Sequence, residues 1–190
     1  MGDSTFNTGE PLGYLITWTT YGTWLPGDDR GWNRKDICGI QLPDQPRRES
    51  AAIKMTESEF RLTEADRAIV ASTIEKHCLI RRWTLHTANA RSNHVHLVVS
   101  AQGYATETVR DQLKAWCTRN LKASYPGRAN FWTEGASSRY LNTEDDLEAA
   151  ILYVKEAQDR KGDEYQPEAP ASVPLSTTGQ RVLPSTLARK

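Results

Sequence analysis

Seven predicted elements follow one another in the order strand, helix, strand, strand, helix, strand, helix, and this order constrains the fold more than any other feature of the 190 residues. Strands are expected over residues 13–19, 83–90, 95–100 and 138–141, and helices over residues 63–80 and 106–123 and from residue 143 onward. The first six elements match the split β-α-β-β-α-β order of a ferredoxin-like domain. We therefore predict an α+β protein whose antiparallel sheet carries helices on one face, with one extra helix at its C-terminal end.

The chain is long enough for one domain with attached segments. Residues 1–12 are expected to form a polar arm, and residues 13–160 the folded domain. Inside that domain, residues 20–62 are rich in Gly, Pro, Asp and Trp without a steady period, which predicts a long loop insertion. Residues 161–190 are rich in Pro, Ser and Thr, so we expect a disordered tail there.

The charges are distributed unevenly along the chain. With 24 Lys or Arg and 24 Asp or Glu the formal net charge is zero, which excludes a uniformly basic surface. Residues 76–130 nevertheless hold nine basic and two acidic residues together with all four histidines, whereas residues 143–164 hold eight acidic and three basic residues. We therefore expect a polyanion to bind the middle of the chain.

The cysteines and the apolar runs restrict where such a protein works. Cys38, Cys78 and Cys117 lie about 40 residues apart without a CxxC pair, which argues against a disulfide framework and against a zinc finger. The first residues lack an apolar signal core, and no apolar run reaches the roughly 20 residues needed to cross a bilayer. We expect a cytoplasmic protein without a membrane partner.

The triplet His94-Val95-His96 is the most informative short motif. On a strand, residues two positions apart point to the same face, so both imidazoles would stand side by side while Val95 points into the core. Such a pair can bind one cation, although two ligands do not complete a site and a third group must come from elsewhere. The alternatives are two ordinary half-buried histidines or part of a cupin-like metal site.

Tyr153 lies on the last predicted helix, whose buried side is formed by Leu147, Ala150, Ile151 and Val154. On a helical wheel Tyr153 lies about 100–160° away from the apolar stripe, so its side chain is available to face a site. The alternative interpretation is a tyrosine used for packing or placed on the surface.

Together these motifs resemble a known family. His94-Val95-His96 resembles the His-hydrophobic-His signature of the HUH endonuclease superfamily, and Tyr153 resembles the nucleophile of its single-tyrosine transposases. The subgroup that the chain most resembles contains the REP-associated tyrosine transposases and the insertion-sequence-200-like transposases. The resemblance covers roughly residues 13–160, and it includes the segments 13–18, 22–27, 131–132 and 139–141.

The resemblance implies metal-dependent nicking and joining of single-stranded DNA, with His94 and His96 holding Mg²⁺ or Mn²⁺. The Tyr153 hydroxyl would attack the scissile phosphate, which gives a 5′-phosphotyrosine intermediate and a free 3′-OH. The expected partners are single-stranded or hairpin DNA, and a second copy of the chain in a homodimer. Two rival functions stay open: a decayed or domesticated relative that only binds hairpin DNA, and a small metalloenzyme acting on small molecules.

The third metal ligand is open between two residues of the tyrosine helix. In the family a Gln or Asn four residues after the tyrosine completes the site, but that position here is Ala157. Glu156 suits a regular helix, because three positions correspond to about 60° round the axis and five positions to about 140°. Gln158 suits the resemblance, provided that a π-type widening after Tyr153 absorbs one extra residue. We predict Gln158 together with this widening.

Basic residues form the expected DNA-binding set, although a solvated helix surface explains each residue taken singly about equally well. The set consists of Arg81, Arg82, Arg91, Arg110, Lys114, Arg119 and Lys122. Trp24, Trp32 and Trp132 could stack on unpaired bases, with core packing as the alternative.

Overall fold

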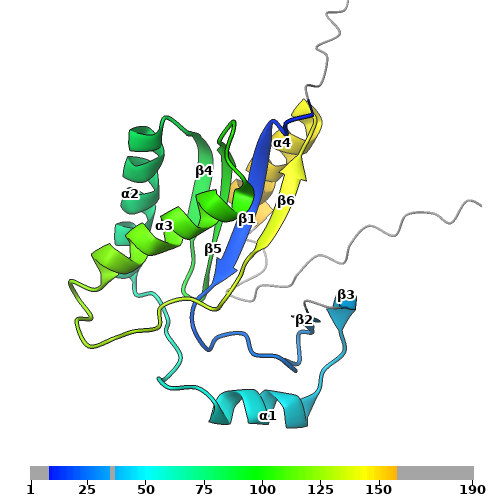
Figure 1. The fold of residues 1–190 in the computed structure, drawn as a ribbon, viewed down its shortest axis with the longest axis vertical. Coiled ribbons are helices and arrows are strands. Elements are labelled where there is room, and N and C mark those ends of the chain that lie inside the picture. Colours follow the sequence, from blue (N-terminus) through cyan, green and yellow to red (C-terminus); the bar gives the residue numbers. More distant parts are fainter. Residues whose placement is uncertain (1–8, 35–36, 158–190) are drawn as a thin grey trace, which may run out of the picture.

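A computed structural model describes residues 9–34 and 37–157 of the protein (Figure 1). Its centre is a four-stranded antiparallel sheet with the strand order β4-β5-β1-β6. The strands are β1 (Gly13–Thr19), β4 (Thr84–Ala90), β5 (His94–Ser100) and β6 (Ser137–Leu141). Apart from the elements within residues 20–62, the strands and helices follow one another in the order that the sequence predicts, so the α+β fold class with a split β-α-β-β-α-β sheet is confirmed.

Two long helices, α2 (Glu64–Arg81) and α3 (Thr106–Leu121), cover one face of the sheet (Figure 1). Helix α2 begins at a capping box, in which the Thr63 hydroxyl accepts from the Asp66 N–H and the Asp66 carboxylate accepts from the Thr63 N–H. It ends at Arg82, which adopts the left-handed conformation with φ 57°. Both boundaries lie within about one residue of the predicted ones.

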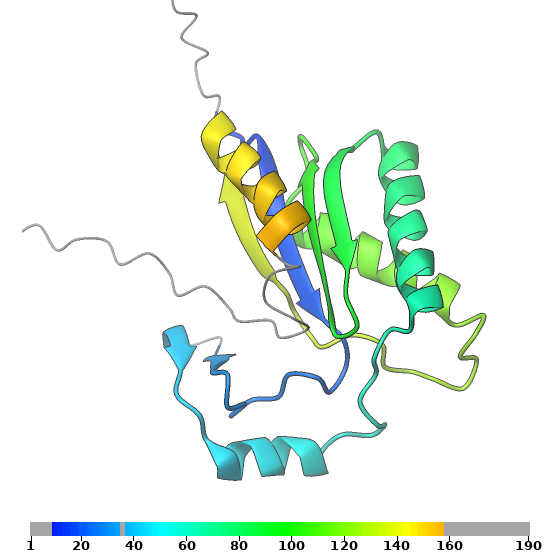
Figure 2. The same cartoon turned by 180° about the vertical axis from the view of Figure 1, so that it is seen from behind.

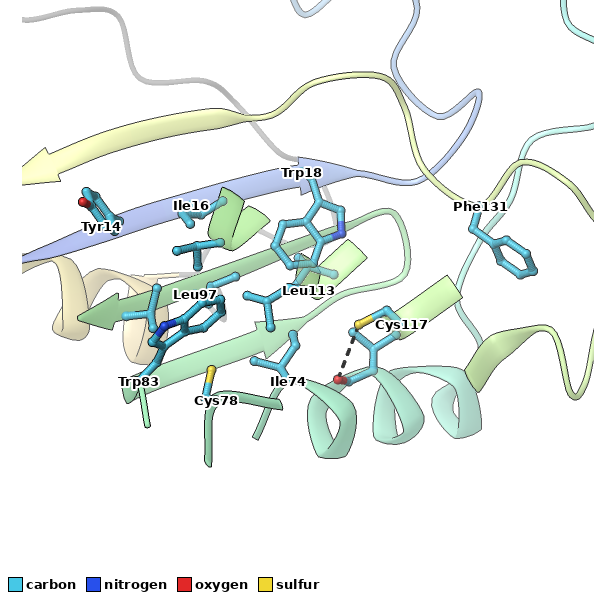
Figure 3. Close-up of a cluster of buried hydrophobic side chains, with 14 of the residues drawn as sticks. Tyr14, Ile16, Trp18, Ile74, Cys78, Trp83, Leu97, Leu113, Cys117 and Phe131 are labelled. Carbon is cyan, nitrogen blue, oxygen red and sulfur yellow. Dashed lines mark hydrogen bonds between the residues drawn. The ribbon is translucent and has the colours of Figure 1, made fainter. Parts of the chain in front are cut away.

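The main hydrophobic core fills the space between this face and the two helices. Alternate residues of the two central strands supply its floor, and Figure 3 shows Ile16, Trp18 and Leu97 packed against Ile74 of α2 and Leu113 of α3. All five side chains are buried. Because strand side chains alternate between faces, this packing leaves the even-numbered residues of β5 for the opposite face.

The C-terminal helix lies on that opposite face (Figure 2). It consists of α4 (Glu144–Leu152), capped by the Thr143 hydroxyl, and of the π-helical turn η1 (Tyr153–Ala157). Ala150 and Val154 pack on Val98 of β5 and Leu141 of β6 in a second, smaller hydrophobic cluster. The extra helix that the sequence predicts is therefore the only helix in the described part of the chain that packs on this face.

The segment over residues 20–62 is more regular than the long loop that the sequence predicts. It contains the antiparallel hairpin of β2 (Trp32–Arg34) and β3 (Ile37–Gln41), followed by α1 (Gln45–Ile53). No residue of α1 is buried, so it lacks the apolar periodicity from which a helix is recognised. Turn geometry holds the segment together: Gly27, with φ 91°, lies so close to the Asp44 carbonyl that a side chain would collide with it.

Two expected segments fall outside the described residues, wholly or in part: the tail over 161–190 and most of the arm over 1–12. Within the residues that the structure describes, no helix is both long enough and apolar enough to cross a membrane.

Candidate active site

His94 and His96 lie in the centre of the sheet, on the face that α4 covers. Their strand β5 is paired on one side with β1 and on the other with β4, and both side chains are only 1% exposed. Their ring centres are 4.6 Å apart, with an angle of 76° between the ring planes. The predicted side-by-side arrangement of the two imidazoles is therefore present.

Each ring is oriented by a hydrogen bond at its Nδ1 atom. His94 Nδ1 lies 2.6 Å from Asn93 Oδ1, and His96 Nδ1 lies 2.6 Å from the Thr17 hydroxyl of the neighbouring strand. An amide oxygen only accepts, so Nδ1 of His94 donates and the lone pair of that ring is on Nε2. Hydrogen bonds of this kind fix the tautomer and the orientation of histidines that bind metals.

The environment keeps His96 uncharged at neutral pH. Burial lowers the pKa of its imidazole to about 3, with smaller contributions from the nearby positive charges of His94 and Arg91. A histidine must be deprotonated at the nitrogen that binds a metal, so the low pKa suits a ligand.

This pKa predicts how the stability of the metal-free protein depends on pH. The pKa of His96 is about 3 in the folded state and 6.5 when unperturbed, so between these values only the unfolded state takes up the proton. The stabilising contribution of neutral His96 is thus complete above pH 6.5 and is lost as the pH falls toward 3, by up to about 1.4 kcal/mol per pH unit. Urea unfolding in EDTA across this range should show a steeper loss for the wild type than for His96→Gln. Parallel curves would contradict the assignment.

Tyr153 is the first residue of η1, and its side chain lies beside His96. Its half-buried ring lies edge-on to His96, with 5.9 Å between ring centres. The turn η1 lies over β4 and β5, where the Asn89 side-chain amide donates to the Val154 carbonyl at 3.3 Å. Because Asn89 pairs with His96 across the two strands, this bond attaches the tyrosine turn directly beside the pair.

The donors present fit a divalent metal ion. The rings of His94 and His96 are adjacent, and each is hydrogen-bonded through its Nδ1 atom, so Nε2 is the atom that would bind an ion. Two imidazole nitrogen donors, both oriented from Nδ1, therefore suit a cation at the Nε2 edge of the rings.

The structure bears on both candidates for the third metal ligand, Glu156 and Gln158. Among the His, Cys, Asp and Glu residues of the described ranges, no group of three is placed to hold a metal ion, so the exposed Glu156 does not join the pair. The predicted π-type widening is confirmed, since residues Tyr153–Ala157 form a π-helical turn. Gln158 itself lies outside the described residues, and its role as a ligand stays a prediction.

The hydrogen bond between the Thr17 hydroxyl and His96 Nδ1 gives a test of this site. Thr17→Val keeps the shape of the side chain but removes the hydroxyl that orients His96. We expect the affinity for Mn²⁺, measured by isothermal titration, to fall about tenfold, which is the usual size of such an effect. Thr84→Val, at an exposed position of β4 opposite Ser100 and far from His94, is the control and should bind Mn²⁺ like the wild type. Equal affinities of all three proteins would show that Thr17 does not act on the metal site.

The predicted DNA-binding residues do not gather around the histidine pair. Arg91, in the turn before β5, is close enough to lower the pKa of His96. Arg81 and Arg82 lie before β4, at the far end of β5 from His94, because Thr84 pairs with Ser100. Arg81 stacks on the rings of Trp83 and Tyr104. The remaining four residues are on or directly after α3, across the sheet from the pair: Arg110, Lys114, Arg119 and Lys122.

The basic residues of α3 also have partners within the protein. Arg110 pairs with Asp111, which raises the pKa of its guanidinium. The Lys114 ammonium donates to the carbonyls of Thr133 and Gly135, and burial lowers its pKa to about 8. Arg119 lies over the ring of Trp116. A role of these residues in binding DNA phosphates stays a prediction, and it would concern a surface away from Tyr153.

Three residues of the site have no counterpart in the sequence-based prediction: Thr17, Asn89 and Asn93. Asn93 directly precedes the histidine motif, and this position is a signal that could have been used. Thr17 and Asn89 reach the site only through the pairing of β1 and β4 with β5, and a single sequence does not reveal this register.

Comparison with known proteins finds similarity at the level of structure. One similar structure is a protein from Deinococcus radiodurans named as a candidate transposase: 12% identity, 76% of this chain and 88% of that chain covered, TM-score 0.45. Another is a REP-associated tyrosine transposase bound to a REP hairpin: 11% identity, 92% and 94% covered, TM-score 0.47. No family model matches the chain, and no curated protein sequence matches it.

Proposed function

We propose that this chain is a metal-dependent enzyme that nicks and rejoins single-stranded DNA through a 5′-phosphotyrosine intermediate. The observation that carries the proposal is the position of Tyr153, whose ring lies 5.9 Å from that of His96, itself one of two adjacent buried imidazoles. A nucleophile and a pair of imidazole nitrogen donors on one face of a sheet form the constellation that such a reaction needs.

The residues divide the chemistry between them. Tyr153 Oη forms a bond to phosphorus while the bond from phosphorus to the 3′-oxygen breaks, the phenol loses its proton and the 3′-oxygen gains one. His94 and His96 would hold Mg²⁺ or Mn²⁺, and such an ion supplies positive charge against the negative charge that develops on the phosphate. A DNA 3′-hydroxyl that attacks the phosphotyrosine reverses the step and releases the tyrosine. Because the phosphate ester is conserved throughout, rejoining needs no other energy source.

The proposed substrate is hairpin DNA with single-stranded flanks, which is the substrate that the sequence resemblance implies. To test the reaction, the full chain is incubated with such a labelled hairpin and Mn²⁺. We expect an adduct that survives denaturation in detergent, that maps to the Tyr153 peptide, and that leaves a DNA fragment with an extendable 3′-OH. An adduct on another residue would overturn the assignment of the nucleophile.

A second candidate function is DNA binding without cleavage. It is favoured by one observation: the described residues include no third His, Cys, Asp or Glu beside the pair. In the same assay, retention of the hairpin without an adduct under both Mg²⁺ and Mn²⁺ would support binding alone. Tight binding of Zn²⁺ without any affinity for DNA would instead support a metalloenzyme that acts on small molecules.

A further inference from the structure

A pocket of about 460 Å³ lies next to the histidine pair, between the end of β1, the start of β6 and the segment over residues 20–62. Its wall includes Thr17, the residue whose hydroxyl binds His96 Nδ1. Ser137, directly opposite Thr17 in the pairing of β1 with β6, lines it as well. The pocket is therefore a direct continuation of the sheet face on which the proposed chemistry takes place.

We infer that this pocket binds an unpaired nucleobase of the DNA strand, adjacent to the phosphate that Tyr153 attacks. The inference rests on the proposed function and adds a recognition site to it. The volume falls in the range of about 300–1,000 Å³ that is usual for small-molecule sites, so one base with its sugar can enter.

The chemistry of the wall suits a base. A nucleobase has flat apolar faces and a polar edge that carries both hydrogen-bond donors and acceptors. The pocket offers the apolar side chains of Trp24, Trp32 and Leu25, together with the hydroxyl of the exposed Ser137, whereas the Thr17 hydroxyl is bonded to His96. A hydroxyl donates and accepts, so it can serve either kind of group at the edge of a base.

The two tryptophans are held in place before any ligand arrives. Trp24 Nε1 donates to the Gly31 carbonyl at 2.7 Å, and Trp32 Nε1 donates to the Leu42 carbonyl at 3.0 Å. Trp32 is only 8% exposed, and the Arg47 guanidinium lies over its ring at 4.9 Å from the ring centre. The half-buried Trp24 is therefore the more accessible indole for contact with a base. Stacking of a base on an aromatic side chain depends on accessible aromatic surface and is tolerant of sequence.

The charge of the pocket wall favours an uncharged base over a phosphate of the DNA backbone. Among the described residues that line the pocket, none is Lys or Arg, and the single charged residue is the acidic Glu134. A phosphate group would lose hydration there and gain no cation. The backbone must therefore run along the rim, while the uncharged base enters.

The first experiment measures the affinity of the full chain, in a Tyr153→Phe background that cannot cleave, for a hairpin with single-stranded flanks. An abasic site is moved along the flanks one nucleotide at a time, and the Kd is measured by fluorescence anisotropy. We expect one position at which the missing base weakens binding about 5- to 150-fold, the range measured for base–aromatic stacking. A Kd that is the same for every abasic position overturns the inference.

Variants then locate the effect. Ser137→Phe places a ring in the mouth of the pocket without removing core atoms, because Ser137 is exposed. It should weaken binding of the intact hairpin by the same factor and abolish the further loss at the critical abasic position. Ser124→Phe adds the same ring at an exposed site beyond α3 and should leave both values unchanged. Ser137→Phe that remains sensitive to the abasic site would place the base elsewhere.

A second measurement leaves the pocket unaltered. 5-Iododeoxyuridine at the critical position is cross-linked to the protein by ultraviolet light, and the peptides are identified by mass spectrometry. Cross-links to Trp24 or Trp32 support the inference, and cross-links only to other segments overturn it. If the abasic scan is flat while the wild type forms the Tyr153 adduct, the pocket assignment fails and the proposed reaction stands. If the Kd depends on the abasic position but the wild type forms no adduct, the pocket assignment stands and the proposed reaction fails.

Discussion

Tyr153→Phe will abolish the covalent protein–DNA adduct and reduce strand cleavage at least about 1,000-fold, as expected when a nucleophile is removed. The substitution deletes one oxygen atom and keeps the ring that lies edge-on to His96. Folding and hairpin binding should therefore stay as in the wild type. Adduct formation is measured by denaturing electrophoresis, and binding of the hairpin by anisotropy.

The matched control is Tyr140→Phe, which removes a phenol oxygen from β6. Tyr140, on the edge strand β6, is 51% exposed, and its ring contacts Tyr14 of β1 away from the pair. Its cleavage rate should equal that of the wild type. If Tyr153→Phe still forms the adduct, another residue is the nucleophile and the proximity of Tyr153 to His96 has a packing role.

His96→Gln will raise the Mn²⁺ concentration needed for half-maximal cleavage at least about 100-fold, because it removes one of two nitrogen donors. The glutamine is similar in length and polar, so the hydroxyl of Thr17 keeps a possible partner. Manganese binding can be followed without DNA by electron paramagnetic resonance, which separates loss of the metal from loss of the substrate. A thermal unfolding curve of each variant checks that the fold is retained.

His86→Gln serves as the control for His96→Gln. His86 belongs to β4, is only partly buried, and its Nε2 bonds to the hydroxyl of Ser100 at the other end of β5. Its replacement should change neither Mn²⁺ affinity nor cleavage. Should both histidine variants cleave normally at low Mn²⁺, the pair is not a metal site and the two imidazoles have a structural role.

The order of the four sheet strands and of helices α2, α3 and α4 could be predicted because each of these elements carries a local signal. Thr63 and Asp66 mark the start of α2, and the acids after Thr143 mark the start of α4. The alternation in β5 placed His94 and His96 on one face, because residues two apart on a strand always share a face. These features depend on near neighbours in the chain, and one sequence contains them.

The partners of the histidines could not be predicted in the same way. Thr17 lies 79 residues from His96, and only the register between β1 and β5 brings them together. The helix α1 gave no signal because none of its residues is buried. The positions of the basic residues on α3 follow from which face of the sheet that helix covers, which charge counting does not reveal.

The π-helical turn was predictable only with the help of the resemblance. Ala157 occupies the position where the family places a ligand, and the extra residue before Gln158 suggested a wider turn. A single sequence taken alone would predict a regular helix here, because π-helical turns are rare. In the structure the turn begins at Tyr153 itself.

The histidines and the tyrosine of the candidate site lie on parts of the fold that differ in local stability. Strand β5 is bonded on both sides and packs on the main core, so its amides should exchange with solvent deuterium only when the whole domain unfolds. Helix α4 and η1 are attached through the small cluster around Val98 and Leu141, the Arg139–Asp146 ion pair and the Asn89–Val154 hydrogen bond, so their opening costs fewer contacts than the opening of β5. The tyrosine, with any strand linked to it, could thus swing away and return while the histidines stay fixed.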